Sequence, residues 1–309
     1  MIEGLAFLLL FPGLAFQVAC GLCFEWLDRK LLALFQRRVG PPWYQPLADM
    51  IKLLSKEDLL PKGADDRVAA LLPILSLSAV LTAGLYIPIA GFGPFSFEGD
   101  LIVILFLMSV PTLAYYLAGV LSIGVYSILG GSRSLLQFFS YEVPLLIVLN
   151  GPAVMSGSWS VAAIMRSQSE LGPFILFQPL GFLLAVVGLI GKLKRAPLDI
   201  PSAKSEVVGG SLTEFTGVKL ALWRLTMNIQ AVVGVFLLVN LYMGWTKLAF
   251  NPLVSILVFI LECLALVAVL SAASALFSRL RIDQLAGLGW KLLVPLSLLQ
   301  LAVVILMRI

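Results

Sequence analysis

The chain has 309 residues, of which 60% are hydrophobic and 12% charged, with a formal net charge of +4 and no histidine. Its mean hydropathy is +1.03; apolar runs of about 20 residues recur along it, which excludes a water-soluble class and indicates a bilayer protein. The lack of histidine removes the commonest metal ligand and neutral-pH base. A modest positive charge gives no reason to expect nucleic-acid binding.

Eight apolar runs predict an all-α polytopic membrane protein, because open sheet edges cannot be satisfied in lipid and the runs lack the alternation of barrel strands. The first run should persist as a helix, since no basic residue precedes it as in a signal peptide. The whole chain, 1–309, is then a single integral membrane domain. The expected spans are roughly Gly4 to Leu27, Leu71 to Phe92, Leu101 to Ile123, Leu135 to Ser156, Phe174 to Gly191, Leu220 to Met243, Leu253 to Phe277 and Leu292 to Leu306.

Basic residues predict the orientation of the chain. The connections after the odd-numbered spans hold 17 of the 21 Lys and Arg, so the positive-inside rule puts these connections in the cytoplasm and both termini outside. Two of them, 28–70 and 192–219, hold 13 of the 17. The cytoplasmic side is therefore the expected working face.

The first long connection carries two helical signals. Glu25 and Arg29 form an i, i+4 pair in the favourable order, although on spacing alone a solvated helix end is the favoured explanation. Pro46 can open an amphipathic helix, which would lie along the membrane surface or under a docked partner. Its apolar residues follow helical spacing at Leu47, Met50, Ile51 and Leu54.

Glu142 lies inside the fourth apolar run, where a carboxylate costs ~2.5–3.5 kcal/mol on insertion scales. Burial favours the neutral form, so Glu142 is a candidate proton carrier. The alternative is a helix that starts later, with Glu142 at its N-terminus. Arg224 in the sixth span needs an acidic or carbonyl partner, which Glu142, Glu206 or Glu214 could provide.

The three cysteines do not predict a metal site. Cys20 and Cys23 form CxxC, but small packing residues three apart in an apolar helix explain this spacing. With Cys263 they make three thiols, fewer than the four ligands of a usual iron–sulfur cluster. Any redox cofactor must belong to a partner.

Four motifs in order give the chain a family resemblance. They are LDRKLLALFQRRVGP, QPLADMIKLLSKE, SYE, and RAPLDIP followed by SEVVGG and TEFTG. Together they resemble the family of the H subunit of respiratory complex I (NADH-quinone oxidoreductase), a membrane subunit. The chain is also similar to the corresponding subunit of energy-converting membrane-bound nickel–iron hydrogenases and related ferredoxin-dependent sulfur-reducing complexes, over nearly its whole length.

The resemblance implies a non-catalytic membrane-anchor and coupling subunit in the cell inner (cytoplasmic) membrane. Its partners would be peripheral-arm iron–sulfur and hydrogenase-like subunits, antiporter-like subunits and small membrane subunits, and these partners would hold the iron–sulfur clusters and any nickel–iron centre. By motif match, the ion path includes Glu142, Asp199, Glu206 and Glu214. Charged residues expected at the cytoplasmic side, Glu25, Asp28 and Arg224, extend it. Docking and cavity residues are Arg29, Lys30, Gln36, Arg37, Arg38, Gly40, Pro41, Asp49, Arg195 and Lys204.

Departures from the complex I pattern indicate which branch of the family this chain resembles most. Where complex I usually has ETNRAPFDLPEAESE, this chain has KLKRAPLDIPSAKSE, so Lys192, Ser202 and Lys204 replace acidic residues. The segment between GP and QP also shrinks to Pro42-Trp43-Tyr44. These changes argue against a bound quinone and favour the ferredoxin-linked branch, which reduces protons or a sulfur compound and moves H⁺ or Na⁺.

Two alternatives stay open at this stage. One is the quinone-site subunit of an NADH- or ferredoxin-quinone oxidoreductase. The other is a stand-alone secondary transporter, although the expected broken helices in paired halves are missing from the sequence.

Overall fold

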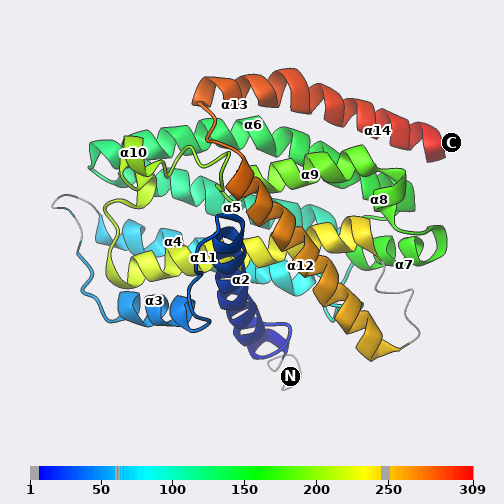
Figure 1. The fold of residues 1–309 in the computed structure, drawn as a ribbon, viewed down its shortest axis with the longest axis horizontal. Helices are drawn as coiled ribbons and strands as arrows, with labels where there is room; N and C mark the ends of the chain where they lie inside the picture. The colour runs from blue at the N-terminus through cyan, green and yellow to red at the C-terminus, as the bar shows by residue number, and fades with distance from the viewer. Residues whose placement is uncertain (1–6, 60, 62, 64, 245–250, 309) are drawn as a thin grey trace.

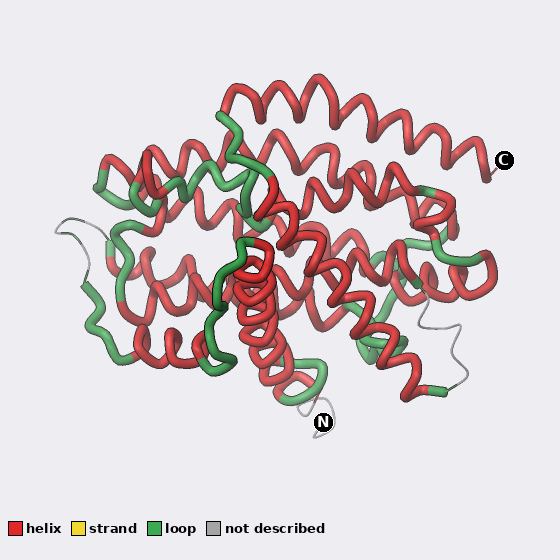
Figure 2. Tube along the Cα trace, viewed as in Figure 1, coloured by secondary structure: helices red, strands yellow, loops and turns green. Residues whose placement is uncertain are grey.

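The computed structural model describes residues 7–308 except 60, 62, 64 and 245–250, together with all side chains in that range except those of Lys204 and Ser205. The described residues are helices joined by loops (Figure 2). The helices are α2 (Leu14–Phe35), α3 (Gln45–Leu54), α4 (Asp66–Tyr86), α5 (Asp100–Leu121), α6 (Val125–Ser156), α7 (Val161–Leu171), α8 (Phe174–Phe177), α9 (Pro179–Lys192), α10 (Lys204–Val207), the 3₁₀-helix η1 (Gly210–Leu212), α11 (Gly217–Leu238), the π-helix η2 (Val239–Met243), α12 (Pro252–Leu276), α13 (Ile282–Leu288), the π-helix η4 (Gly289–Leu293) and α14 (Val294–Arg308).

The expected all-α polytopic fold is confirmed, although the first span continues eight residues past its expected end at Leu27, to Phe35, and the fifth span is broken. Seven helices of the described chain are long and apolar enough to cross a membrane. The one expected span that is not among these seven is the fifth, from Phe174 to Gly191, which is broken at Gln178 into α8 and α9. Because Pro179 opens α9 and leaves it only 14 residues, this helix is about 21 Å long and falls short of the ~30 Å core.

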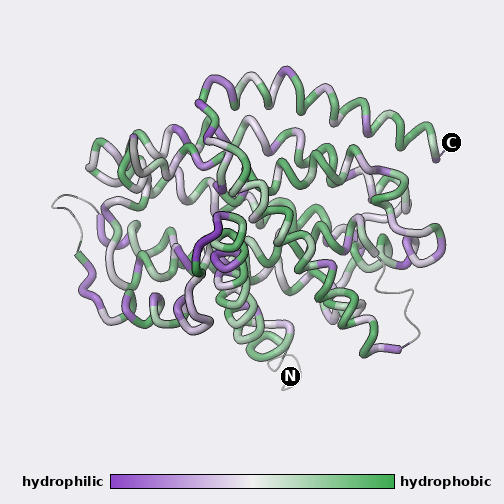
Figure 3. The backbone as a smooth tube through the Cα atoms, viewed as in Figure 1, coloured by the Kyte–Doolittle hydropathy of each residue, from purple (hydrophilic) through white to green (hydrophobic). Residues whose placement is uncertain are grey.

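The long helices form a bundle with α11 at its centre. In Figure 1, α4, α5, α6, α9, α11 and α14 run lengthwise, and α2 and α12 cross in front of α11. In the most apolar stretch of the span formed by α11 and η2, 83% of the residues are buried, a larger share than in any other described span. In Figure 3 the longest hydrophilic stretch lies where α2 ends and the loop after it begins, and the helices are otherwise mostly hydrophobic.

Helix α6 begins ten residues before the expected start at Leu135. Its first turns are rich in small residues and face the loop before α11, where the Ser127 hydroxyl donates to the Ser211 carbonyl at 2.9 Å. A Cβ on Gly130 would stand 2.6 Å from the Ser211 backbone nitrogen. This close approach requires glycine, so residues that look like a loop in sequence are helical here.

The expected amphipathic helix is confirmed as α3, with Pro46 in its first turn. Leu47, Ile51 and Leu54 on α3 are each more than half exposed, whereas Leu53 is buried against the bundle. The chain therefore leaves an apolar helical face uncovered, which is the property expected of a helix that lies on lipid or under a partner.

Candidate functional site

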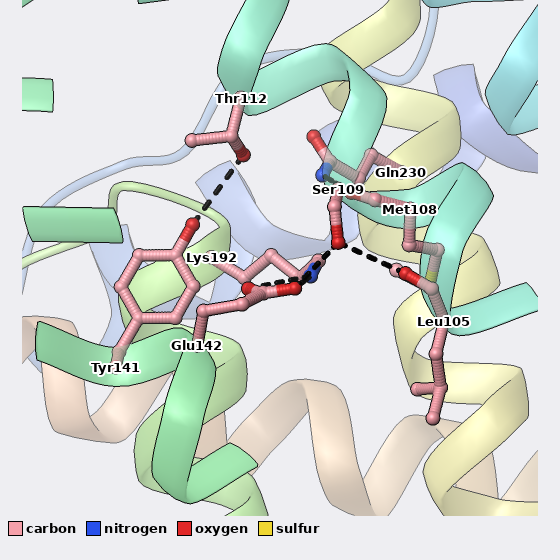
Figure 4. Close-up of polar contacts among 8 residues, drawn as sticks. All are labelled: Leu105, Met108, Ser109, Thr112, Tyr141, Glu142, Lys192 and Gln230. Carbon is pink, nitrogen blue, oxygen red and sulfur yellow. Dashed lines mark hydrogen bonds and ion pairs between the residues drawn. The ribbon is translucent and has the colours of Figure 1, made fainter. Parts of the chain in front are cut away.

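A buried ion pair lies in the interior of the bundle, between α6 and α9. The Lys192 ammonium nitrogen is 2.6 Å from Glu142 Oε1 and 2.8 Å from Oε2 (Figure 4). The side chains of Lys192 and Glu142 are only 3% and 5% exposed. Glu142 is in the middle of the continuous helix α6, so the alternative that placed it at a helix N-terminus was wrong.

One hydroxyl group is bonded to this ion pair, and two others nearby are bonded to each other. Ser109 on α5 donates to Glu142 Oε1 at 2.6 Å. Thr112, one turn further along α5, lies 3.3 Å from the hydroxyl of Tyr141, the residue before Glu142. Figure 4 shows the Ser109 hydroxyl beside the Glu142 carboxylate, whereas the Tyr141 hydroxyl points to Thr112. A buried carboxylate is thus supplied with both a countercharge and a hydroxyl donor, as burial requires.

Apolar side chains close the site on its remaining sides. A cavity of about 10 Å³ adjoins Lys192 and has mostly leucine walls. Such a volume is at the limit for one water molecule. Its lining residues are Leu105, Met108, Leu145, Leu146, Leu149, Leu189, Lys192, Gly234, Leu237 and Leu238.

The loop that follows Lys192 is held by ion pairs to other connections. Arg195 lies 2.8 Å from Asp28, and the Ser271 hydroxyl donates to the same carboxylate at 2.7 Å. Asp199 pairs with Arg279 at 2.8 Å. Segments expected on one side of the membrane therefore meet at one end of the bundle.

Lys194 takes an uncommon position in this loop. Its backbone has a left-handed φ of 52°, and its ammonium lies 3.1 Å from the centre of the Tyr115 ring, a cation–π contact. Burial holds the pKa of Lys194 well below its usual range, although the Asp199 carboxylate acts in the opposite direction. At the end of α9, Lys192 thus contacts α6, and Lys194 just after it contacts α5.

The first connection forms a second charged cluster. Arg29 pairs with Glu25, as the spacing predicted, and also with Asp49 of α3 at 2.9 Å. The Asn228 amide of α11 donates to Glu25, which links the cluster to the central helix. The hydrogen bond from Arg29 lowers the pKa of Asp49, as do a hydrogen bond from Gln45 and the charge of Arg224.

Other residues expected at the docking surface lie around this cluster. Gly40 sits against Lys30, where a Cβ would stand 2.6 Å from its Cδ. The Pro41 carbonyl accepts a hydrogen bond from the Trp26 indole at 3.3 Å. Gln36, Arg37 and Arg38 are exposed between α2 and α3. The side chain of Lys204 lies outside the described residues.

The expected partners of Arg224 are not its partners in the structure. Glu142 pairs with Lys192, and Glu206 pairs with Arg133. Glu214 is half-buried against Gly124, at the turn between α5 and α6. Arg224 is exposed and acts electrostatically on Asp49, because a long side chain near the end of a span reaches the surface.

Sequence reasoning missed the immediate surroundings of Glu142. Lys192 was expected only as a substituted position in a loop, whereas it is the last residue of α9 and the partner of Glu142. Ser109, Thr112 and Tyr141 were not predicted. The sequence signal for Ser109 and Thr112 was a polar residue at every third position on α5, at Ser109, Thr112 and Tyr115, within an otherwise apolar run.

Two further features concern metal binding and a larger cavity. No cluster of three or more Cys, Asp or Glu side chains within the described ranges could hold a metal ion. An apolar cavity of about 520 Å³ lies between α2, α11 and α12, and Cys20, Cys23 and Cys263 are all in its wall.

Comparison with known proteins identifies relatives over almost the whole chain. The sequence profile described as NADH dehydrogenase matches residues 7–305. The H subunit of NADH-quinone oxidoreductase from Dehalococcoides mccartyi (strain CBDB1) is 35% identical over 296 residues, which cover 93% of this chain and 82% of that protein. The H subunit from Thermomicrobium roseum is 36% identical over 312 residues, 92% of this chain and 90% of that one.

A solved structure has the same fold. It is the membrane-bound sulfane sulfur reductase, an archaeal respiratory membrane complex, one chain of which superposes with a TM-score of 0.86 and 26% identity. The match covers 94% of this chain and 96% of that chain.

Proposed function

Because the chain belongs to the NADH dehydrogenase family, that of the H subunit of complex I, we propose that it couples electron transfer in a peripheral arm to ion translocation. The chain is a multi-pass membrane subunit of a complex I-related respiratory complex. In the proposal it anchors that arm, moves no electrons itself, and passes a change at its loops to neighbouring antiporter-like subunits that carry H⁺ or Na⁺.

The buried pair of Glu142 and Lys192 is the observation that carries this proposal. Lys192 ends α9 and continues directly into the loop 192–219, so a shift of this loop moves the ammonium away from Glu142. A carboxylate left without its partner in the membrane interior is strongly disfavoured. Glu142 then takes up a proton from the cytoplasmic side, and returns it when Lys192 comes back.

The proposed electron donor is ferredoxin, and the proposed acceptor is a proton or a sulfur compound. Support comes from Lys192, Ser202 and Lys204, which stand where complex I usually has acidic residues, and from the similarity to a sulfane sulfur reductase chain. The redox centres, iron–sulfur clusters with or without nickel–iron, would belong to partner subunits. The chain would lie in the cytoplasmic membrane with both termini outside.

A quinone-site subunit is the second candidate, because the relatives at 35% and 36% identity are named NADH-quinone oxidoreductase subunits. Purification in mild detergent separates the two: a copurifying peripheral subunit with the cysteine pairs that hold a nickel–iron centre supports a hydrogenase-type complex. A chain that purifies alone and transports a solute in liposomes would instead support the secondary transporter.

Separate measurement of electron transfer and ion translocation tests the coupling role. In Glu142→Gln and Glu214→Gln complexes reconstituted into vesicles, we expect electron transfer to continue while translocation falls at least tenfold in Glu142→Gln. Glu170→Gln is the matched control, because Glu170 is exposed on α7 and away from the loop 192–219. Unchanged translocation in both Glu142→Gln and Glu214→Gln would refute the path.

A further inference from the structure

The hydroxyl group of Ser109 has two acceptors and a single hydrogen. Its oxygen lies 3.0 Å from the Leu105 carbonyl, one turn back on α5, and 2.6 Å from Glu142 Oε1. A serine hydroxyl donates one hydrogen bond and has two lone pairs to accept others. Ser109 can therefore donate to Leu105 or to Glu142 at any one time, but not to both.

The two orientations suit the two protonation states of Glu142. When Glu142 is ionised, Oε1 accepts from Ser109 and Lys192, and Oε2 accepts from Lys192. When a proton arrives on Oε1, this oxygen becomes a donor. Ser109 then accepts that hydrogen and turns its own toward the Leu105 carbonyl, so the new O–H group has an acceptor after Lys192 has moved away.

This exchange avoids the main cost of protonation inside the membrane. A buried donor or acceptor without a partner costs roughly 1–3 kcal/mol, and no other hydroxyl of the described chain is shown bonded to Glu142. With the Ser109 rotation, the carboxyl hydrogen of the protonated form and the hydroxyl hydrogen of Ser109 both keep an acceptor. Only one O–H bond forms, to Oε1, and no group besides the incoming proton is consumed.

We propose that Ser109 is a positioning residue whose hydroxyl reverses its hydrogen bond when Glu142 gains or loses a proton. This inference rests on the proposed function, because it takes Glu142 to be the group that titrates during turnover. It adds a residue from α5 to a site that otherwise links α6 with α9. The role needs a hydroxyl at this position, and volume alone does not fulfil it.

Infrared difference spectroscopy of the whole complex, oxidised against reduced, tests this proposal. The C=O stretch of protonated Glu142 is identified by its loss in Glu142→Gln. In Ser109→Ala we expect this band to move to higher wavenumber, because the protonated carboxyl has lost its acceptor. Ion translocation should fall about tenfold, the effect of one hydrogen bond to a charged group. In Ser109→Thr, which keeps a hydroxyl, the band position and the translocation should match those of the unmodified complex.

Ser76→Ala is the matched control. Ser76 is fully buried on α4 and donates to the Leu72 carbonyl one turn back at 2.8 Å, the same local bond that Ser109 makes, without a carboxylate beside it. This variant should leave band and translocation unchanged. If Ser109→Ala does not assemble, Ser109→Cys, with similar volume and a weak donor, replaces it and should show the same two changes.

The outcomes separate the inference from the proposed function. If Glu142→Gln abolishes translocation but Ser109→Ala behaves as the unmodified complex, the role of Ser109 is refuted and the coupling role stands. A complex that shows no protonated Glu142 band during turnover would also refute it. If Glu142→Gln translocates normally, the proposed function fails first.

Discussion

At Glu142 the chain meets its own need for a countercharge. An ionised carboxylate in the bilayer interior is costly unless it is paired and hydrogen-bonded, and here the partner is a lysine that enters from the end of a short helix. In the proposed mechanism, Lys192 does more than change the local charge. The position of one loop decides whether Glu142 keeps its countercharge.

The first residue-scale prediction concerns stability. Lys192→Met leaves Glu142 without its partner and should destabilise the protein by about 3–5 kcal/mol. Adding Glu142→Leu should recover most of this loss, because an apolar pair of similar volume is close to neutral. Unfolding in mixed detergent, followed by circular dichroism, measures the difference.

Arg133 provides the control for this double substitution. Its partner Glu206 has a side chain that is 56% exposed, and pairs of this kind contribute less than about 1 kcal/mol. Arg133→Met should therefore have a small effect. Equal losses in Arg133→Met and Lys192→Met would contradict a special role for burial at Glu142.

Sequence reasoning found the acidic half of this pair and missed the basic half. An ionisable residue in an apolar run is conspicuous, so Glu142 could be identified from the sequence alone. Its partner lies 50 positions away, at a helix end whose exact position depends on packing. Ser109 was missed because a single serine in an apolar span usually bonds only to its own helix.

At the scale of elements, the contact of α2 with α3 depends on a few charged groups. Arg29 bridges Glu25 on its own helix and Asp49 on α3. This contact lowers the pKa of Asp49 in the folded protein. It therefore stabilises the fold fully at a pH above the pKa that Asp49 has in the unfolded chain. The stabilisation is lost as the pH falls through the pKa of the folded state. The relevant window lies below about pH 4.

The corresponding prediction uses limited proteolysis of the exposed segment between α2 and α3. Cleavage near Arg37 and Arg38 should become faster in the unmodified protein as the pH is lowered from 5 to 3, with an acid-stable protease. In Asp49→Asn it should already be fast at pH 5 and change little. Asp283→Asn, on the exposed side of α13, should behave as the unmodified protein, and acceleration there would contradict the assignment.

Helix boundaries show what the pattern of apolar residues can and cannot predict. Spans with a continuous apolar run, such as α5 and α12, were predicted within a few residues. Helix α6 began earlier than predicted, because Gly130 and Gly131 allow contact with α5 and the loop before α11. The break at Gln178 was missed, since Pro179 suits both a helix start and a helix interior in a membrane.

At the scale of the whole molecule, the charged connections gather at one end of the bundle. Asp28 with Arg195, Asp199 with Arg279, and Arg133 with Glu206 join helix ends and loops that are far apart in the sequence. The segment Gln36–Val39 and the apolar face of α3 stay exposed beside them. Exposed arginines beside an apolar helical face leave this surface open to a partner, and arginine is enriched in protein interfaces.

The last prediction concerns assembly at this surface. If the proposed peripheral arm docks here, Arg37→Glu with Arg38→Glu should release it from the purified complex, because the exposed guanidinium groups have no described ion pair within the chain. The fold should not change. Arg166→Glu, exposed on α7, is the control. Quantitative mass spectrometry of subunits retained after affinity purification measures the loss, and retention of the arm in the double variant would place the docking surface elsewhere.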